Sequence, residues 1–383
     1  MRQLSPGVLI LLLVSPLLLF GLAQKLAEPY LYTFTILWIG TLLGATLNFF
    51  QYGFSSSFRS MILEKRTVGM RAIVVLLGLA ILLFAPLLAT EQLGDQSFTG
   101  FIRTLSLALP IGAFIFGIGM QIGCGCTSGT LNRVGQIQAL SFTTLFFMVI
   151  GGTLAAYTFE DWSSLPAIEP FAFQLEFGWI GGLVVQMLLL IGLFLLLKKI
   201  ETNSHYHSSK KYQPLFIVRG KSIYSHSFFL AAISLAILNA SLLLISGTPW
   251  SISSIFPYWG SGLIDLLKLP LDWTFWDYSM ENATRMNQGP LENTVSLTTM
   301  GVLIGAFLVS LLRPRVKVSI NRNRLIGSVL GGTVMGFGAV MASGCNIGAF
   351  FSGIASGSLH GWVWLVFALL GNILGLAIRK RLI

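Results

Sequence analysis

Charged side chains are scarce in this chain of 383 residues. Only 10% of the residues are Asp, Glu, Lys or Arg, whereas 54% are hydrophobic and the mean hydropathy is +0.79. One water-exposed globule cannot bury so much apolar surface, so a soluble globular protein is excluded. The composition predicts an all-α polytopic membrane protein.

The chain instead contains many long runs of apolar residues. They have the length of about twenty residues that a helix needs to cross a bilayer. They lie at 4–22, 30–50, 72–90, 98–118, 139–157, 178–197, 227–247, 293–312, 325–342 and 358–378. We therefore expect about nine or ten transmembrane helices, with the first run a span rather than a cleaved signal peptide.

Two further absences limit the chemistry. The chain has three cysteines, Cys124, Cys126 and Cys345, which are too few and too far apart for a disulfide framework. It has no GxxxxGK[ST] motif, which argues against ATP hydrolysis by this chain.

The net charge of +10 is confined to short loops, which argues against a nucleic-acid partner. Lys and Arg gather at 59–71, 198–226, 313–324 and 379–381, and acidic residues gather at 91–95, 160–176 and 247–292. Loops rich in Lys and Arg are retained on the cytoplasmic side of a membrane. The alternation predicts a multi-pass protein in the lipid bilayer of the cell membrane, with both termini cytoplasmic.

One stretch rich in glycine and cysteine occurs twice. GIGMQIGCGCTSGT at 117–130 reappears at an offset of 219 as GFGAVMASGCNIGA at 336–349. Five residues are identical, because Gly117, Gly119, Gly125, Cys126 and Gly129 fall on Gly336, Gly338, Gly344, Cys345 and Gly348. Gly112 and Gly331 extend the match upstream, so the apolar helix leading into each turn is duplicated too.

These glycines predict that each leading helix breaks. A glycine in a helix interior costs roughly 0.8–1 kcal/mol relative to alanine. Irregular backbone at membrane depth survives where protein or water satisfies it, so each break should line an internal cavity. Close helix packing on glycine is the alternative. Loop charge gives the two leading helices opposite directions, which predicts two inverted repeats with broken or re-entrant segments that meet near the midplane.

The basic stretch 198–226 is the expected boundary between the repeats. It separates an N-terminal repeat half, 1–197, from a C-terminal repeat half, 227–383, and we predict that it is a cytoplasmic linker. The polar segment Phe54–Arg59 is either a short re-entrant half-helix or the end of a longer helix. A weaker match of Gly40 and Gly44 with Gly301 and Gly305 does not fit the inversion and indicates ordinary Gly-xxx-Gly helix packing.

The duplicated turns contain the candidate substrate path. Its predicted residues are Cys124, Gly125, Cys126, Thr127, Ser128 and Gly129 in the first copy, and Ser343, Gly344, Cys345, Asn346 and Gly348 in the second. Hydroxyl, amide and backbone N–H groups donate hydrogen bonds, and the soft sulfur of cysteine suits a sulfur-bearing ligand. Neither motif contains Asp or Glu, so the site favours an anion over a metal cation.

Other roles for these residues remain open from sequence. Arg103 and Arg133 lie nearest the first motif in sequence, and either attract an anion or anchor the chain at the interface. A membrane-embedded thiol enzyme would need a base beside its cysteine, and His360 is the only histidine near a motif. A metal site made by the three cysteines is a second alternative. We expect neither, and predict no catalytic residues, no cofactor and no metal.

The two motifs resemble those of a known family. GCGCTSGT at 123–130 and GCNIGAFFSGIASGSLHGW at 344–362 are similar to the YeeE/YedE membrane proteins, which include thiosulfate uptake transporters and selenium-compound transporters. The resemblance covers both halves of the chain. It departs at two places: Gly53 precedes Phe54 where family members often carry a further cysteine, and Cys124 is extra.

The resemblance implies a transporter of the bacterial inner membrane rather than an enzyme. It implies an hourglass of helices with loops that meet at the centre, and Cys126 and Cys345 along the route of the substrate. The substrate implied is a small sulfur-containing anion like thiosulfate, with a selenium compound as the alternative. A cytoplasmic sulfur-carrier protein that consumes the product is an implied partner.

Overall fold

The computed structural model describes residues 28–202, 217–218, 221–222, 226–312 and 320–382. In these residues, nine helical segments are long and apolar enough to cross a membrane. They contain α2 (Glu28–Phe49), α4 (Val68–Thr90), α5 (Ala108–Ile122), α7 (Ala139–Tyr157), α9 (Phe173–Thr202), α10 (His226–Ser246), α14 (Thr294–Leu311), α15 (Arg322–Met341) and α17 (Leu359–Leu382). The prediction of an all-α polytopic membrane protein is confirmed.

Shorter elements complete the described structure. They are α3 (Phe54–Glu64), α6 (Thr127–Gly135), α8 (Phe159–Ser163), α11 (Ile255–Leu266), η1 (Trp273–Phe275), α12 (Asp277–Glu281), α13 (Ala283–Met286), η2 (Asn346–Ser352) and α16 (Gly353–Ala355). Three antiparallel ribbons of two-residue strands pair β1 (Gln92–Leu93) with β2 (Gln96–Ser97), β3 (Leu105–Ser106) with β4 (Ala167–Ile168), and β5 (Ile217–Val218) with β6 (Lys221–Ser222). The segment Phe54–Arg59 thus begins a separate short helix, α3.

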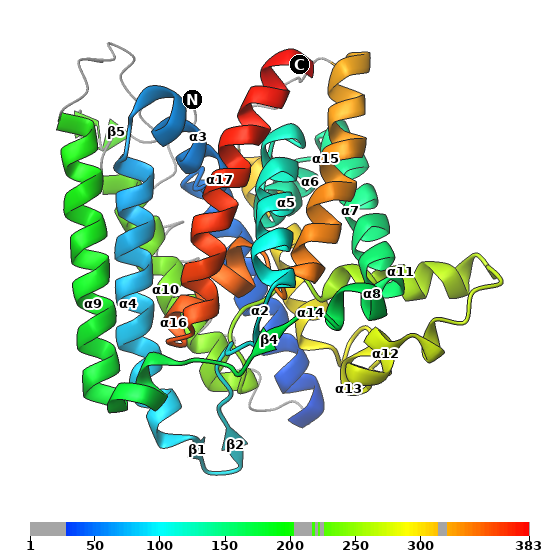
Figure 1. The fold of residues 1–383 in the computed structure, drawn as a ribbon, viewed down its shortest axis with the longest axis horizontal. Coiled ribbons are helices and arrows are strands. Elements are labelled where there is room, and N and C mark those ends of the chain that lie inside the picture. The colour runs from blue at the N-terminus through cyan, green and yellow to red at the C-terminus, as the bar shows by residue number, and fades with distance from the viewer. Residues whose placement is uncertain (1–27, 203–216, 219–220, 223–225, 313–319, 383) are drawn as a thin grey trace.

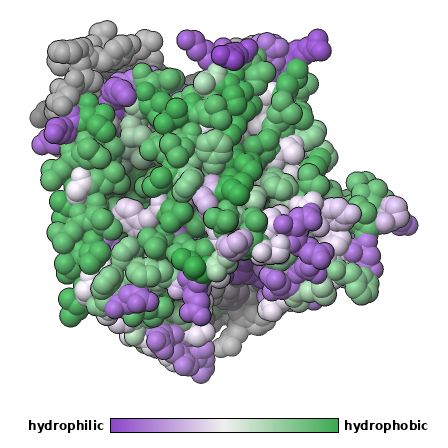
Figure 2. Space-filling model, viewed as in Figure 1, coloured by the Kyte–Doolittle hydropathy of each residue, from purple (hydrophilic) through white to green (hydrophobic). Residues whose placement is uncertain are grey.

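The long helices stand side by side (Figure 1), and many of their apolar side chains are exposed. Large hydrophobic residues on α9, such as Leu188, Ile191 and Leu195, are more than half exposed. In Figure 2 hydrophobic residues cover most of the face over the helices, while hydrophilic residues gather at the two ends. Such a belt is a liability in water but matches the hydrocarbon layer of a bilayer.

Most predicted spans agree with the helices, but one does not. The apolar run 98–118 was expected as a helix, whereas α5 begins at Ala108 and 98–107 has no helical turn. Phe98 and Phe101 are buried, so this run is apolar because it enters the interior in an extended form. Its backbone groups find partners outside a helix. β3 pairs with β4, and the Phe101 N–H donates a hydrogen bond to Ser356 Oγ. The expected span 4–22 lies outside the described residues.

The charged segments lie at opposite ends of the helices, as the alternation predicts. The C-terminus, the start of α15 and α3 lie at the upper end in Figure 1, whereas β1, α8 and α12 lie at the lower end. We call these the basic end and the acidic end. That the basic end faces the cytoplasm remains a prediction. α9 runs on to Thr202, past residue 198 where the linker was expected to begin, and most of 203–225 lies outside the described residues, so the linker remains a prediction.

The two leading helices of the repeat, α5 and α15, cross in direct backbone contact. A Cβ on Gly112 would meet the backbone of Ala342, and a Cβ on Gly119 would meet that of Met335. Residues nearer the end of α5 contact residues nearer the start of α15, so the two helices are antiparallel. This confirms the prediction of two inverted repeats.

The helices that follow the two turns exchange partners between the repeats. α17 packs against α5, with Gly371 on the backbone of Phe114, and α7 packs against α15, with Gly151 on the backbone of Thr333. Phe114 and Thr333 are equivalent positions of the repeat, so the same contact is made twice. Each half therefore completes the core of the other.

The second glycine pattern joins α2 to α14 as ordinary helix packing. Gly40 lies against Thr298 and Gly301, and Gly305 lies against Thr41 and Ala45, so these two helices are parallel. Small residues let helix backbones approach closely where lipid gives no hydrophobic drive for association.

We predict that this α2–α14 contact does not tolerate a methyl group. In Gly305→Ala the new Cβ meets the backbone of Thr41, and overpacking of this kind costs about 1–3 kcal/mol. The detergent-purified variant should unfold at a lower temperature than the wild type, as followed by size-exclusion chromatography after heating. Gly192→Ala on α9 is the matched control, because its Cβ enters open space and alanine favours a helix. Equal unfolding temperatures for both variants would contradict the packing.

Candidate functional site

The first glycine-cysteine turn ends one helix and starts another. α5 stops at Ile122, and α6 begins after Cys126, which has an extended backbone and serves as the N-cap. The Cys126 sulfur accepts a hydrogen bond from the Gly129 N–H at 3.4 Å and lies 3.5 Å from Ser128 Oγ. The cap thus satisfies one of the N–H groups that every helix start leaves unpaired.

The second turn repeats this arrangement with a wider helix. Cys345 is again the extended N-cap residue, and the π-helix η2 follows it. The Cys345 carbonyl accepts from the N–H groups of Ala349 at 3.0 Å and Phe350 at 3.3 Å. Gly344 has no room for a side chain, because its Cβ would meet the backbone of Ala349. The Cys345 sulfur lies near the N–H of Gly348, the equivalent of Gly129, but does not form the capping hydrogen bond of the first turn.

The residues two positions before the cap cysteines are also equivalent. Cys124 and Ser343 both have left-handed backbone conformations, with φ of 63° and 49°. In the second copy, Ser343 therefore occupies the position that corresponds to Cys124. Because the repeats are inverted, these two side chains point toward opposite ends of the protein.

The two turns meet in the interior. Cys126 is 1% exposed and Cys345 is 0% exposed, and the Thr127 side chain lies beside the Cys345 sulfur. Cys126 is also within electrostatic range of Cys345. Both half-helices therefore start at one buried place, where the positive ends of their dipoles add.

Two polar side chains at this place lack hydrogen-bond partners within the described structure. They are both the Nδ2 and Oδ1 atoms of Asn346, and Thr127 Oγ1, which lies beside the Cys345 sulfur without a well-formed hydrogen bond to it; both residues are fully buried. Thr127 and Asn346 are equivalent positions, each directly after a cap cysteine. A buried polar group without a partner costs about 1–3 kcal/mol, so this pair is suited to a ligand that makes hydrogen bonds.

Residues of α17 hold the second turn in place. Trp364 donates from Nε1 to the Gly344 carbonyl at 3.0 Å, and His360 Nε2 lies 3.0 Å from the Ala342 carbonyl. The Trp364 ring stacks on Phe350 with centroids 5.9 Å apart. The irregular backbone is thus satisfied by protein, as membrane depth requires. His360 is tied to a carbonyl of the turn rather than placed as a base on a cysteine.

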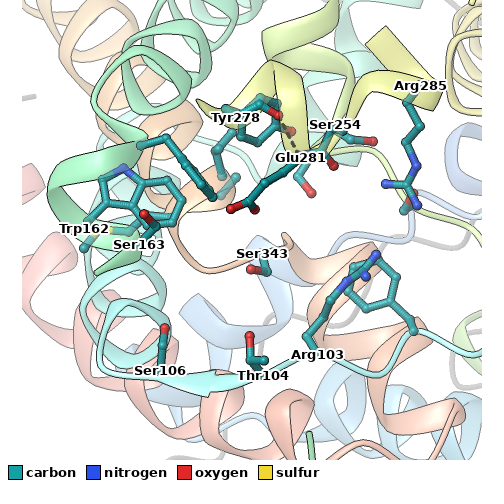
Figure 3. Close-up of a pocket in the computed structure, with 18 of the residues that line it drawn as sticks. Arg103, Thr104, Ser106, Trp162, Ser163, Ser254, Tyr278, Glu281, Arg285 and Ser343 are labelled. Carbon is teal, nitrogen blue, oxygen red and sulfur yellow. Dashed lines mark hydrogen bonds between the residues drawn. The ribbon is translucent and has the colours of Figure 1, made fainter. Parts of the chain in front are cut away.

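A pocket of about 390 Å³ opens on the acidic side of the second turn. We call it the vestibule. The end of α15 and Ser343 form its floor, and the 101–106 segment, α8, Ser251–Ser254 and α12–α13 form its walls. In Figure 3 Ser343 lies at the centre of the view, with Arg103 and Arg285 together on one side. Ser343 is exposed to this space, while the neighbouring Cys345 is buried.

The vestibule carries positive charge near its floor. Two arginines, Arg103 and Arg285, line it together with one acid, Glu281. Burial, and then repulsion from Arg285, lower the pKa of Arg103 below its usual value. The Arg103 guanidinium lies 4.6 Å from the centroid of the Phe101 ring, which fixes its position. A small anion near both arginines would relieve their repulsion.

On the other side of the cysteines, toward the basic end, lies a second group of arginines. Arg133 extends over Gly125, with its Nη1 3.5 Å from where a Cβ would be. Arg59 and Arg379 reach the same region from α3 and α17. Gln121 joins them, because its side-chain oxygen accepts from Arg59 at 3.1 Å and its carbonyl accepts from Arg379 at 3.3 Å.

Sequence reasoning placed some of these residues correctly and missed others. Arg133 lies beside the first motif, but Arg103 lies in the vestibule beside the second. Arg59, Arg285 and Arg379 were not identified, because they approach from segments far away in sequence. Among the described residues, no three His, Cys, Asp or Glu side chains gather closely enough to hold a metal ion.

Comparison with known proteins places most of this chain, including both turns, in one family. The family described as Sulphur transport matches residues 51–374, which include both turns. The thiosulfate transporter TsuA of Spirochaeta thermophila is 26% identical over 348 residues, which are 88% of this chain and 96% of that protein. TsuA of Escherichia coli K12 is 24% identical over 347 residues, 87% of this chain and 90% of that protein. The "Probable transporter YedE" of Escherichia coli K12 is 31% identical over 147 residues, which span 38% of this chain and only 36% of YedE.

We predict that the three thiols differ in their access to solvent. Cys124 is partly exposed, whereas Cys126 and Cys345 are buried. A maleimide reagent should therefore modify Cys124 at least tenfold faster in the detergent-purified protein, as measured by mass spectrometry of the labelled peptides. Cys124→Ser should remove the fast phase, and denaturant should expose all three thiols equally. Fast labelling of Cys126 or Cys345 in the native protein would contradict the buried centre.

Proposed function

We propose that this chain, which belongs to the sulphur transport family, takes up a thiosulfate-like anion across the bacterial inner membrane. The family makes it a membrane transporter of sulfur compounds and not an enzyme. The finer proposal is the substrate and the route, which runs between the two glycine-cysteine turns. Two relatives that match most of this chain are named as thiosulfate transporters, and this supports the substrate.

The observation that carries the proposal is the buried pair of unpartnered polar side chains beside two cysteines. Asn346 offers hydrogen bonds that no described residue accepts or donates, and Thr127 Oγ1 lies beside the Cys345 sulfur without a well-formed hydrogen bond. Cys126 and Cys345 place polarisable sulfur at the same point. Thiosulfate has both chemistries, since its oxygens accept hydrogen bonds and its outer sulfur is soft.

The charge of the site suits an anion. Neither turn contains a carboxylate, and two half-helices begin there with their positive ends. An anion that leaves water at membrane depth needs such fixed dipoles in place of its hydration shell. A selenium oxyanion has the same charge and shape, so it is the alternative substrate.

The proposed route begins in the vestibule and ends at the basic end. Arg103 and Arg285 attract the anion, and exposed Ser343 leads it to Cys345 and Asn346. The anion then passes from the second turn to Thr127 and Cys126 of the first turn. Cys124 lies beyond these two residues, toward the basic end. With the basic end in the cytoplasm, this direction is uptake, and a cytoplasmic sulfur-carrier protein is the proposed acceptor of the product.

We predict that cells or proteoliposomes containing this protein accumulate radiolabelled thiosulfate. Unlabelled thiosulfate should compete fully, and sulfate should compete weakly because it lacks the soft outer sulfur. Selenium oxyanions added as competitors test the alternative substrate. Vesicles without the protein are the control. If no sulfur or selenium species is transported or bound, the proposed function is wrong.

We predict that Cys126→Ala and Cys345→Ala each lower the rate of thiosulfate uptake by about tenfold to a hundredfold. Each change removes one soft group from a desolvated path, where losing a buried partner costs about 1–3 kcal/mol and 1.4 kcal/mol is a factor of ten. Expression should change little, and the unfolding temperature should fall only slightly, by more in Cys126→Ala because this variant also loses the cap on the Gly129 N–H. Cys124→Ala, at the partly exposed side, should have a milder effect. Normal transport by both buried-cysteine variants, with Cys124→Ala inactive, would show that the paired turns are not the route.

A further inference from the structure

Three arginines converge on Cys124 from three different elements. Arg59 comes from α3, Arg133 from α6 and Arg379 from the last turn of α17. Arg59 is within electrostatic range of both other arginines and of Cys124, and Arg133 is within range of Arg379, Cys124 and Cys126. All three side chains are half-buried, so their charges are only partly hydrated.

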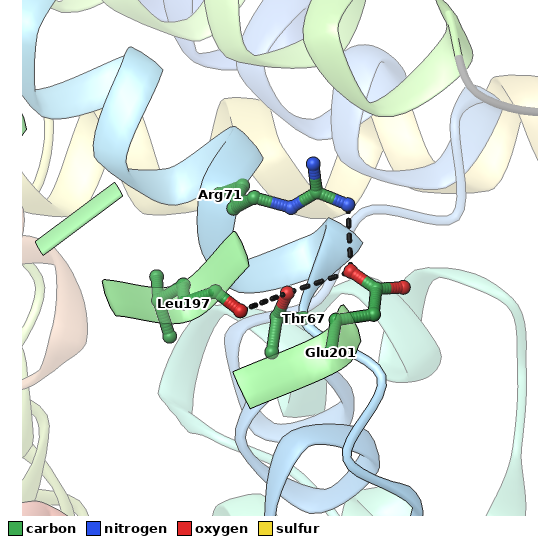
Figure 4. Close-up of polar contacts among 4 residues, drawn as sticks. All are labelled: Thr67, Arg71, Leu197 and Glu201. Atoms are coloured by element: carbon green, nitrogen blue, oxygen red, sulfur yellow. Dashed lines mark hydrogen bonds and ion pairs between the residues drawn. The ribbon is translucent and has the colours of Figure 1, made fainter. Parts of the chain in front are cut away.

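This cluster has no acidic partner in the part of the chain that the structure describes. Other arginines of the described residues do have acidic partners, since Arg66 pairs with Glu64 and Arg71 with Glu201. Figure 4 shows how an arginine at the basic end is ordinarily neutralised, since Arg71 lies 2.7 Å from the Glu201 carboxylate, which also accepts from Thr67. Arg59, Arg133 and Arg379 instead lie close to one another, where like charges repel.

Gln121 fixes the geometry of the cluster. It is fully buried, and it accepts from Arg59 on its side chain and from Arg379 on its carbonyl. Its Nε2 donates to Asn372 Oδ1 at 2.5 Å, so its orientation is set from α17. These two hydrogen bonds hold the guanidinium groups in place but do not neutralise their charges. They preorganise donors for an anion that arrives from elsewhere.

We propose that Arg59, Arg133 and Arg379 form an inner anion-binding site for a small tetrahedral dianion, beside Cys124. Guanidinium groups present N–H donors in a fixed fork that matches oxyanions. The site lies on the opposite side of the buried cysteines from the vestibule. For its natural ligand, thiosulfate leaving the central site, this inference rests on the proposed function.

We predict that the dianion shields Cys124 from modification. Maleimide labelling of Cys124 in the full-length purified protein should slow at least fivefold in saturating sodium thiosulfate, and also in sodium sulfate. In Arg133→Gln and Arg59→Gln the half-protecting concentration should rise at least tenfold. Arg322→Gln is the matched control, because Arg322 is an exposed arginine at the same end and outside the cluster. Protection that is absent, or equal in all variants, overturns the site.

The outcomes separate this site from the transport proposal. Uptake of thiosulfate without protection of Cys124 refutes the inner site alone. Protection by sulfate that depends on Arg133, in a protein that transports no sulfur species, supports the site and refutes the proposed substrate. A lipid phosphate has the same chemistry, so the assay is repeated in nanodiscs of phosphatidylcholine and of phosphatidylglycerol. Protection by phosphatidylglycerol alone, with no further effect of thiosulfate, would assign the site to a headgroup and overturn the proposal.

Discussion

The backbone contact between α5 and α15 is the constraint on which the rest depends. Glycines at 112, 119, 331 and 338 let two antiparallel helices touch without side chains between them. Only at that distance can the turns that end the two helices reach each other from opposite sides. The caps, the paired cysteines and the shared positive dipole ends all follow from this crossing. A larger residue there would separate the two halves of the central site before it changed any group in it.

The sequence was sufficient for the features that repeat locally. The spacing of glycine and cysteine predicted where the helices break, and loop charge predicted that the repeats are inverted. It was insufficient where position depends on distant segments. Arg59 and Arg379 are 320 residues apart, and only the packing of α3 and α17 around Gln121 joins them. Hydropathy also failed at 98–107, because a buried extended segment and a transmembrane helix are equally apolar.

The two sides of the centre are built from the same fold but from different chemistry. Toward the acidic end the turn presents Ser343 to an open vestibule with two arginines and a glutamate. Toward the basic end it presents Cys124 to three arginines without a carboxylate partner among the described residues. The second side therefore has the stronger positive field. The duplicated scaffold therefore carries more positive charge on one side of its centre than on the other, and such charge raises the local concentration of small anions.

Cys124 and Ser343 also bear on how this protein balances stability against activity. A residue with a Cβ in the left-handed region costs about 1–2 kcal/mol, which glycine avoids. A chain shaped by stability alone would have glycine at both turns, as it has at many neighbouring positions. It retains side chains at the two positions that look out from the centre toward opposite sides of the membrane. Placing glycine at either position would relieve the left-handed backbone strain but would remove the thiol or hydroxyl that the side chain supplies there.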